Sequence, residues 1–174
     1  MSFKLYDYAL SGNCYKIRLF ASILKLDYER IAVEFYPGAE HKSREMLQIS
    51  PAGTLPILKS GDMILSETPA MLFWMAKKFD RSGSWWLGGD DENLQAFILQ
   101  WMGFSGQLSD TIGKARLNAL FQKPIDKENT IKRARLLLRQ IELRLTEQSF
   151  DDKKYLVNHN PTIADIACFP YVAL

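Results

Sequence analysis

The pattern of apolar and polar positions along the chain changes near residue 80. Up to that point, short runs that alternate between apolar and polar residues, such as FKLYD at 3–7, are separated by stretches with helical spacing. Beyond it, apolar residues recur every three or four positions over long stretches, which is typical of amphipathic helices. The sequence therefore predicts a mixed α/β part followed by an all-helical part.

The first part predicts the element order β-α-β-(α)-β-β-α, a small mixed four-stranded sheet with helices packed on it. Pro56 interrupts the third strand, and Ser-Gly-Asp at 60–62 marks a hairpin turn before the fourth. Ser66 can cap the last helix, with Pro69 tolerated in its first turn. The predicted strands are 3–7, 29–35, 55–58 and 63–65, and the predicted helices are 13–25, 43–49 and 66–79.

The segment RSGSWWLGGDD, residues 81–91, is rich in glycine and serine and predicts a linker. Three helices are expected after it, the third beginning at Thr162, where Asp165 completes a capping box. We therefore expect a first domain over 1–80 and a helical-bundle second domain over 92–174. The predicted core faces are Leu94, Phe97, Ile98, Trp101, Ser105 and Leu108 on the first of these helices, and Ile131, Ala134, Leu138, Ile141 and Leu145 on the second.

The composition and charge of the chain narrow the function classes. Of the 174 residues, 47% are hydrophobic and 24% are charged, as in an ordinary globular protein. The net charge of +2 gives no electrostatic reason to expect nucleic acid or an anionic membrane as partner. No apolar run approaches the roughly 20 residues that span a bilayer, and the start MSFKLYDY lacks the pattern of a signal peptide. We expect a cytoplasmic protein.

The chain has few residues suited to metal or redox chemistry. Cys14 and Cys168 are far apart and form no Cys-x-x-Cys pair, so both are expected to be free thiols in a reducing compartment. Because the only histidines are His41 and His159, we expect no metal site.

A candidate reactive turn lies at residues 9–20, ALSGNCYKIRLF, where the first strand leads into a helix. The free N–H groups and partial positive charge of a helix N-terminus suit an anion. A redox thiol would occupy the capping position, where the helix end lowers its pKa, but Ser11 is found there and Cys14 lies further in. Ser11 is therefore either a plain helix cap or a hydroxyl that donates a hydrogen bond to the anion of a ligand.

Two further segments suit a peptide-like ligand. Proline inside an apparently buried strand is costly unless it makes a bend, often a cis peptide, so Leu55-Pro56 either turns the Leu55 backbone toward a ligand or ends an edge strand. At Ser66-Glu67-Thr68, the N–H groups of a helix N-terminus suit a carboxylate, and Glu67 suits an ammonium group. These two groups match the α-amino acid end of a ligand; the alternative is that the segment only caps its helix.

Four stretches carry a signature when they are taken in order: SGNCYKIRL at 11–19, HKSREMLQISPAGTLPIL at 41–58, LSETPAML at 65–72 and PTIADIACFPY at 161–171. Together they resemble the cytosolic glutathione S-transferase family. The resemblance implies a thioredoxin-like N-terminal domain that binds glutathione and an all-helical C-terminal domain that lines the second-substrate site. It also implies a homodimer.

The resemblance implies roles for particular residues. Ser11 matches the serine that activates the glutathione thiol in serine-type members, and Asn13 lies where some bacterial members use an asparagine to help bind the thiolate. Leu55 precedes the family's cis-proline, here Pro56, and its backbone pairs with the cysteinyl part of glutathione. The other matches are Glu67 and Thr68 for the γ-glutamyl end and His41 and Lys42 for the glycine carboxylate. Trp101 and Phe104, at helical spacing, either line the second-substrate site or belong to the core.

The resemblance favours a detoxification enzyme that adds the thiolate of glutathione, its co-substrate, to an electrophilic small molecule. The alternative is a catalytically idle, transferase-like module that acts in protein interaction. A glutathione-dependent reductase would carry cysteine at position 11, so Ser11 argues against that activity. Family members continue through further helices, so we expect the second domain to be incomplete where the sequence stops at Leu174.

Overall fold

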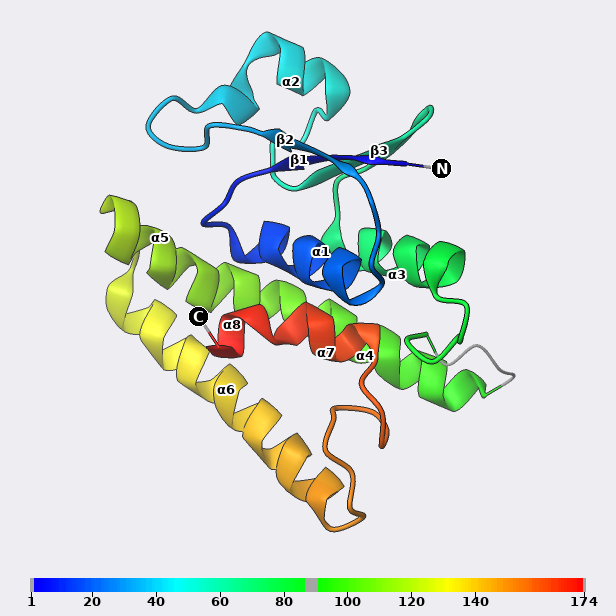
Figure 1. The fold of residues 1–174 in the computed structure, drawn as a ribbon. Coiled ribbons are helices and arrows are strands. Elements are labelled where there is room, and N and C mark those ends of the chain that lie inside the picture. The colour runs from blue at the N-terminus through cyan, green and yellow to red at the C-terminus, as the bar shows by residue number, and fades with distance from the viewer. Residues whose placement is uncertain (1, 87–90, 174) are drawn as a thin grey trace. The chain divides into compact units, whose positions relative to one another are not determined.

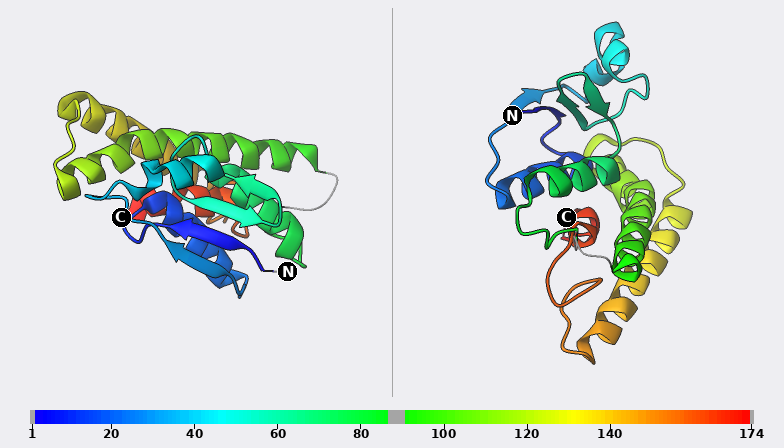
Figure 2. Two further views of the ribbon diagram at one scale, coloured as in Figure 1. Left: turned by 90° about the horizontal axis from the view of Figure 1, so that it is seen from above. Right: turned by 90° about the vertical axis from the view of Figure 1, so that its right-hand side faces the viewer.

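The computed structural model describes residues 2–86 and 91–173 of the chain. The chain divides into two compact units, Met1–Met75 and Ala76–Leu174. The first unit contains a sheet with helices, and the described part of the second contains helices and no strand, as Figure 1 and the two views of Figure 2 show. The division falls inside a helix, slightly before the domain boundary that the sequence predicts at residue 80.

The first unit is built on a four-stranded sheet with strand order β2-β1-β3-β4. β1 runs parallel to β2 and antiparallel to β3, and β3 runs antiparallel to β4. A parallel pair needs a long crossover, which α1 supplies between β1 and β2. The predicted mixed, thioredoxin-like sheet is confirmed. Its elements are β1 Lys4–Asp7, α1 Gly12–Ile23, β2 Glu29–Ala32, η1 Glu40–Lys42, α2 Arg44–Ile49, β3 Ile57–Ser60, β4 Met63–Leu65 and α3 Thr68–Phe79.

The sheet of the first unit is covered on both faces, with α1 and α3 on one side and α2 on the other (Figure 1). Phe3 is buried and meets Trp74 of α3 edge-to-face, with ring centroids 5.9 Å apart. On the α2 side, Met46 packs in a cluster with Val33 and Ile57. Alternation along the strands and helical spacing along α1 together produce these buried faces. The buried apolar side chains of α1 are Cys14, Ile17, Phe20 and Ala21.

Two strands have bounds that differ from those the sequence pattern predicts. β2 ends at Ala32 rather than at residue 35. The N–H of Val33 still donates to the carbonyl of Asp7 at 2.8 Å, and the chain then leaves the sheet. β3 begins at Ile57 rather than at residue 55, because Pro56 has no N–H to contribute to the ladder. β3 also continues to Ser60, two residues past its predicted end, so it is shifted rather than shortened. Apolar alternation continues past Ala32, so the pattern overestimates only β2.

The second unit is all-helical in its described residues, as predicted, but it contains more helices than the three expected. α4 (Glu92–Leu108), the π-helical segment η2 (Ser109–Gly113) and α5 (Lys114–Phe121) follow one another without a break. α6 (Lys127–Ser149), α7 (Ile163–Cys168) and α8 (Pro170–Ala173) complete it, and α7 packs along α4. Within residues 2–86 and 91–173, no helix is long and apolar enough to cross a membrane.

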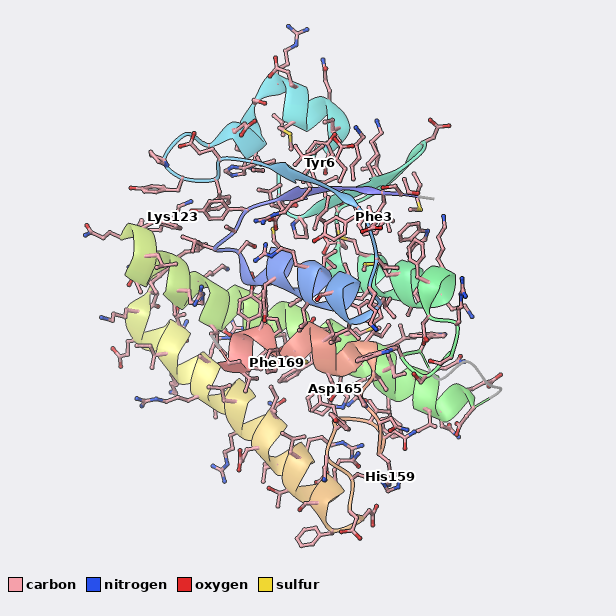
Figure 3. All side chains as sticks on the ribbon, viewed as in Figure 1. Phe3, Tyr6, Lys123, His159, Asp165 and Phe169 are labelled. Carbon is pink, nitrogen blue, oxygen red and sulfur yellow. The ribbon has the colours of Figure 1, made fainter. Side chains whose placement is uncertain are left out.

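The predicted capping box at the start of α7 is confirmed. Thr162 Oγ1 accepts a hydrogen bond from the Ala164 N–H at 3.3 Å, and Asp165 Oδ2 accepts one from the Thr162 N–H at 2.8 Å. The second oxygen of Asp165 (labelled in Figure 3) accepts from the Leu156 N–H at 2.9 Å. Burial raises the pKa of Asp165, and these hydrogen bonds act in the opposite direction. Through its hydrogen bonds to Leu156 and Thr162, the Asp165 carboxylate joins the loop before α7 to the start of that helix.

The core face of α6 differs by one position from the prediction. Leu137 and Ile141 are buried, whereas Leu138 is 38% exposed. Steps of three and four residues from Ala134 reach Leu137 and Leu138 equally well, so periodicity alone does not choose between them. On α4 the predicted face is largely buried, but Phe97 is exposed. Packing within the unit selects the buried side chains.

The described part of the predicted linker is held in place by hydrogen bonds. The Asp80 carboxylate accepts from the N–H groups of Ser82 at 3.0 Å and Trp85 at 2.9 Å. The Trp85 carbonyl accepts from the N–H of Ile163 at 3.0 Å, which connects this segment to the start of α7. Residues 87–90 of the predicted linker lie outside the described residues.

Candidate functional site

The strand register brings three of the predicted segments to one end of the sheet in the first unit. Tyr6 of β1 lies opposite Ile57 of β3, so the turn after β1 and the peptide bond before β3 leave the sheet at the same end. β4 runs antiparallel to β3, so the chain that leads from β4 into α3 also leaves at that end. The candidate residues gathered there are Ser11, Leu55, Pro56, Glu67 and Thr68.

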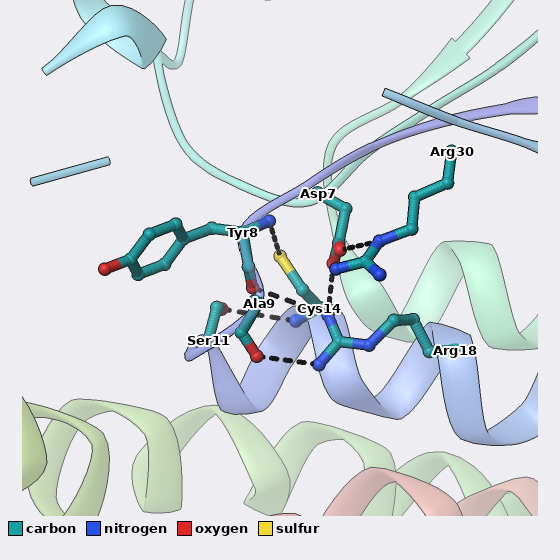
Figure 4. A network of polar contacts seen from close by, with 7 residues as sticks. All are labelled: Asp7, Tyr8, Ala9, Ser11, Cys14, Arg18 and Arg30. Atoms are coloured by element: carbon teal, nitrogen blue, oxygen red, sulfur yellow. Dashed lines mark hydrogen bonds and ion pairs between the residues drawn. The ribbon is translucent and has the colours of Figure 1, made fainter. Parts of the chain in front are cut away.

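Ser11 is the N-cap of α1. Its backbone is extended (φ −76°, ψ 124°), and its N–H donates to the carbonyl of Tyr8 at 3.0 Å. Its Oγ accepts a hydrogen bond from the N–H of Cys14 at 3.2 Å (Figure 4). Because the oxygen is the acceptor in this bond, the hydroxyl proton can be donated to another group. A half-buried hydroxyl at the N-terminus of a helix suits an anionic ligand.

Both thiols of the chain are free and buried, Cys14 at 0% and Cys168 at 2% exposure. The N–H of Tyr8 donates to Cys14 Sγ at 3.4 Å. Burial raises the pKa of Cys14 to about 11, although hydrogen bonds from Ser11 and from the Tyr8 backbone act in the opposite direction. At neutral pH Cys14 is therefore a covered, protonated thiol, unlike a reactive cysteine. Among the described residues, no group of three or more His, Cys, Asp or Glu could hold a metal ion.

The peptide bond between Leu55 and Pro56 is cis, as the family resemblance implied. Pro56 is buried and Leu55 is half-buried. Lys42 Nζ donates to the carbonyl of Ala52 at 3.4 Å, so this ammonium group lies beside the loop that leads to the cis bond. At the start of α3, Thr68 is buried, whereas the preceding residue Glu67 is exposed and its carboxylate is open to a ligand.

A row of three rings leads from η1 toward the Ser11 turn. His41 is buried and stacks on Phe35, with ring centroids 4.4 Å apart and an interplanar angle of 21°. Phe35 in turn meets Tyr8, with ring centroids 5.4 Å apart. The sequence pattern placed Phe35 in a strand and therefore gave it no role at the site. His41 is thus packed near the turn, whereas Asn13 lies half-buried in the first turn of α1.

Trp101 and Phe104 lie on α4 of the second unit. They are 7% and 9% exposed, and their rings meet edge-to-face with centroids 5.0 Å apart. Trp101 borders a cavity of about 270 Å³ between α4 and α6, and Phe104 is not among the residues that line it. The lining residues are Phe97, Gln100, Trp101, Gln140, Leu143, Arg144 and Glu147. Packing accounts for both rings, and their part in binding a second substrate stays a prediction.

Three charged residues next to the Ser11 turn were not singled out from the sequence. The buried carboxylate of Asp7 pairs with the guanidinium groups of Arg18 from α1 and Arg30 from β2 (Figure 4). Alternation along β1 could have found the carboxylate, since it puts Asp7 on the same buried face as Leu5. Neither arginine could have been assigned to it, because the three residues belong to three different elements.

These features define a class of protein: a thioredoxin-like unit with a serine at the N-cap of its first helix and a cis-proline before its third strand, followed by an all-helical unit. Residues 5–83 match the family described as "Glutathione S-transferase, N-terminal domain". The chain is also 31% identical over 174 residues to glutathione S-transferase 2 of Schizosaccharomyces pombe, in an alignment that covers 97% of this chain and 74% of that protein. The chain belongs to the glutathione S-transferase family.

Solved structures of similar proteins have the same fold. A glutathione S-transferase from Pseudomonas fluorescens has a TM-score of 0.85 and 28% sequence identity, with 99% of this chain and 83% of that chain covered. A glutathione transferase homolog from Lodderomyces elongisporus, solved with two GSH per subunit, has a TM-score of 0.88 and 22% identity over the same shares of the two chains. The predicted combination of a thioredoxin-like unit and a helical unit is that of these proteins.

Proposed function

We propose that the chain binds glutathione at the end of the sheet in the first unit and that Ser11 stabilises the glutathione thiolate for transfer to an electrophilic small molecule. The observation that carries this proposal is the convergence of the Ser11 turn, the cis Leu55-Pro56 bond and the start of α3 at one end of the sheet. Membership of the glutathione S-transferase family supports it.

In this proposal each part of the tripeptide has a partner. The extended backbone of the cysteinyl part pairs with the backbone of Leu55 beside the cis bond. The γ-glutamyl end, which carries one ammonium and one carboxylate group, meets the Glu67 carboxylate and the hydroxyl and N–H of Thr68. The glycine carboxylate is held by the exposed ammonium group of Lys42, with His41 beside it.

The thiolate needs only modest stabilisation from the protein. Lowering a thiol pKa from about 8.5 to about 6.5 corresponds to roughly 2.7 kcal/mol in favour of the thiolate. One charge-assisted hydrogen bond contributes about 1.5–3 kcal/mol, and a helix N-terminus contributes about 0.3–2 kcal/mol. The Ser11 hydroxyl and the N-terminus of α1 are therefore sufficient, and Asn13 in the first turn adds a second polar side chain.

The proposed setting is a cytoplasmic homodimer. Trp101 and Phe104 are the proposed aromatic residues of the electrophile site in the helical domain over 92–174, which follows the proposed linker over 81–91. The net charge of +2 favours small-molecule substrates over nucleic acid. Light scattering on the purified chain tests the oligomeric state, and a monomer would contradict the proposed dimer.

The function is tested first by binding to immobilised glutathione and then by a conjugation assay with a generic aromatic halide. We expect retention on the resin, elution by free glutathione and formation of the thioether product. Binding without turnover of any electrophile in a panel would instead favour the catalytically idle interaction module. A demonstrably folded chain that takes up no glutathione at millimolar concentration in calorimetry would refute the proposal.

A further inference from the structure

The carboxylate of Asp7 is buried at the end of β1, with a side chain that is 0% exposed. A buried carboxylate is costly unless it is paired and hydrogen-bonded. Two arginines meet this need, one at each carboxylate oxygen. Arg18 of α1 pairs with Oδ1 through Nη1, and Arg30 of β2 pairs with Oδ2 through Nε.

Arg18 makes further bonds that Arg30 does not make among the described residues. Its Nη2 donates to the carbonyl of Ala9 at 2.9 Å, and its Nη1 also donates to the carbonyl of Tyr8 at 3.4 Å (Figure 4). The Tyr8 carbonyl is the same group that accepts the N–H of Ser11 at 3.0 Å. One planar guanidinium group therefore joins the buried carboxylate to the Tyr8 and Ala9 carbonyls of the turn that carries Ser11.

The middle of the turn contributes little apolar packing. Ala9 and Leu10 lie outside any regular element, and both are exposed, Leu10 at 49%. Apolar packing therefore contributes little to the position of this segment. A displacement of a reacting group by about 1 Å can cost on the order of a hundredfold in rate, so a rigid turn has a direct catalytic value.

We propose that Arg18, anchored on Asp7, is a positioning residue that holds the Ser11 hydroxyl where it reaches the thiolate, whereas Arg30 only neutralises the same carboxylate. The inference rests on the proposed function of Ser11. A lysine cannot replace Arg18, because a single ammonium group lacks the fork that binds a carboxylate and two carbonyls at once. The charge near the turn is the same with either residue, so Arg18→Lys separates geometry from electrostatics.

The test compares Arg18→Lys with the matched control Arg30→Lys, with Ser11→Ala as the reference for complete loss of the hydroxyl. The readouts are the ultraviolet absorbance of bound glutathione thiolate against pH, the pH profile of kcat/KM with an aromatic halide, and unfolding in urea. We expect Arg18→Lys to raise the apparent pKa of the bound thiol by about one and to lower kcat about tenfold at neutral pH, with KM for glutathione changed less than about threefold. Arg30→Lys should leave the thiol pKa and kcat at the parental values.

A readout that needs no glutathione tests the same claim on the free protein. The N–H of Ser11 donates to the Tyr8 carbonyl and the N–H of Cys14 donates to Ser11 Oγ, so amide hydrogen exchange at these two positions reports the geometry of the turn. We expect faster exchange at both in Arg18→Lys, at a global stability equal to that of Arg30→Lys.

Three outcomes would overturn the inference. One is an equal effect of the two lysine variants on the thiol pKa, which would make Asp7 neutralisation the common cause. Another is a parental thiol pKa in Arg18→Lys. The third is unchanged exchange at the Ser11 and Cys14 amides, which refutes the positioning role even if the chain binds no glutathione. Absence of glutathione binding in the parent, together with faster exchange in Arg18→Lys, would refute the proposed function alone.

Discussion

The Oγ atom of Ser11 accepts a hydrogen bond from the N–H of Cys14 at 3.2 Å, three residues further along α1. Ser43 forms the same contact with the N–H of Met46, also at 3.2 Å, at the start of α2. The two serines are therefore equivalent helix caps, and only Ser11 lies at the turn after β1. This equivalence gives the chain an internal control for separating a structural cap from a catalytic hydroxyl.

Ser11→Ala should lower the conjugation rate at neutral pH about ten- to hundredfold, because roughly 1.5–3 kcal/mol of thiolate stabilisation is lost. The affinity for glutathione should change much less, since the proposed contacts of Glu67, Thr68 and the Leu55 backbone with the tripeptide are kept. The measurements are kcat and the thiolate absorbance of bound glutathione, titrated against pH.

Ser43→Ala is the control for this substitution. Each alanine variant should lose about 0.5–2 kcal/mol of stability through its missing cap, but Ser43→Ala should keep the parental rate and thiol pKa. A similar loss of rate in both variants would mean that Ser11 acts only as a cap. If Cys14→Ala abolished the thiolate and Ser11→Ala did not, the wrong residue would have been assigned.

Cys14→Ala should change how the stability of the chain depends on alkaline pH. The thiol of the unfolded chain ionises near its ordinary pKa of 9.0, whereas the buried thiol stays protonated up to about 11. The folded chain therefore loses stability relative to the unfolded chain as the pH rises through this window. Because of the Cys14 thiol, the free energy of unfolding of the parent should fall by about 1 kcal/mol between about pH 8 and about pH 10. This fall should be absent from Cys14→Ala.

The measurement is urea unfolding of the parent and of Cys14→Ala at both pH values. Taking the difference between the two proteins removes the contributions of tyrosine and lysine side chains, which both chains share. If the free energies of unfolding of the two proteins changed equally with pH, the Cys14 thiol would ionise as easily in the folded state as in the unfolded state.

Glu67→Gln should weaken glutathione binding about tenfold with little change in kcat, because it removes the proposed charge-assisted contact to the γ-glutamyl ammonium group. Glu45→Gln is the matched control, since Glu45 is an exposed carboxylate in the first turn of α2. Isothermal calorimetry gives the affinity and steady-state kinetics give kcat. Equal affinities for the two variants would remove Glu67 from the proposed site.

Asp165→Ala should destabilise the second unit more than Asp126→Ala does. Asp126 is an exposed cap of α6 that accepts a hydrogen bond from the N–H of Asn129 at 3.2 Å, and its loss should cost about 0.5–2 kcal/mol. The Asp165 carboxylate binds the N–H groups of both Thr162 and Leu156 in a part-buried site, so its removal leaves two donors unsatisfied. We expect a further loss of about 1–3 kcal/mol, measured by urea unfolding.

Features that depend on near neighbours in the sequence could be predicted well. The caps at Ser11 and Thr162, the alternation in β1 and the amphipathic spacing of α4 each involve residues within about one turn or one strand, where sterics and local hydrogen bonds dominate. The four-stranded sheet and the helical second part followed from the order of these elements. Signature stretches such as SPAGTLPIL added the family and its candidate residues.

Features that depend on packing could not be predicted from the local pattern. The choice of Leu137 over Leu138 as a core residue, and the end of β2 at Ala32, were set by which neighbours were present to cover each side chain or pair with each backbone group. The pairing of Asp7 with Arg18 and Arg30 joins three elements across 23 positions of sequence. A buried charge requires a partner but does not specify which one, because the free energy of pairing depends on distances that exist only once the strands and the helix have come together.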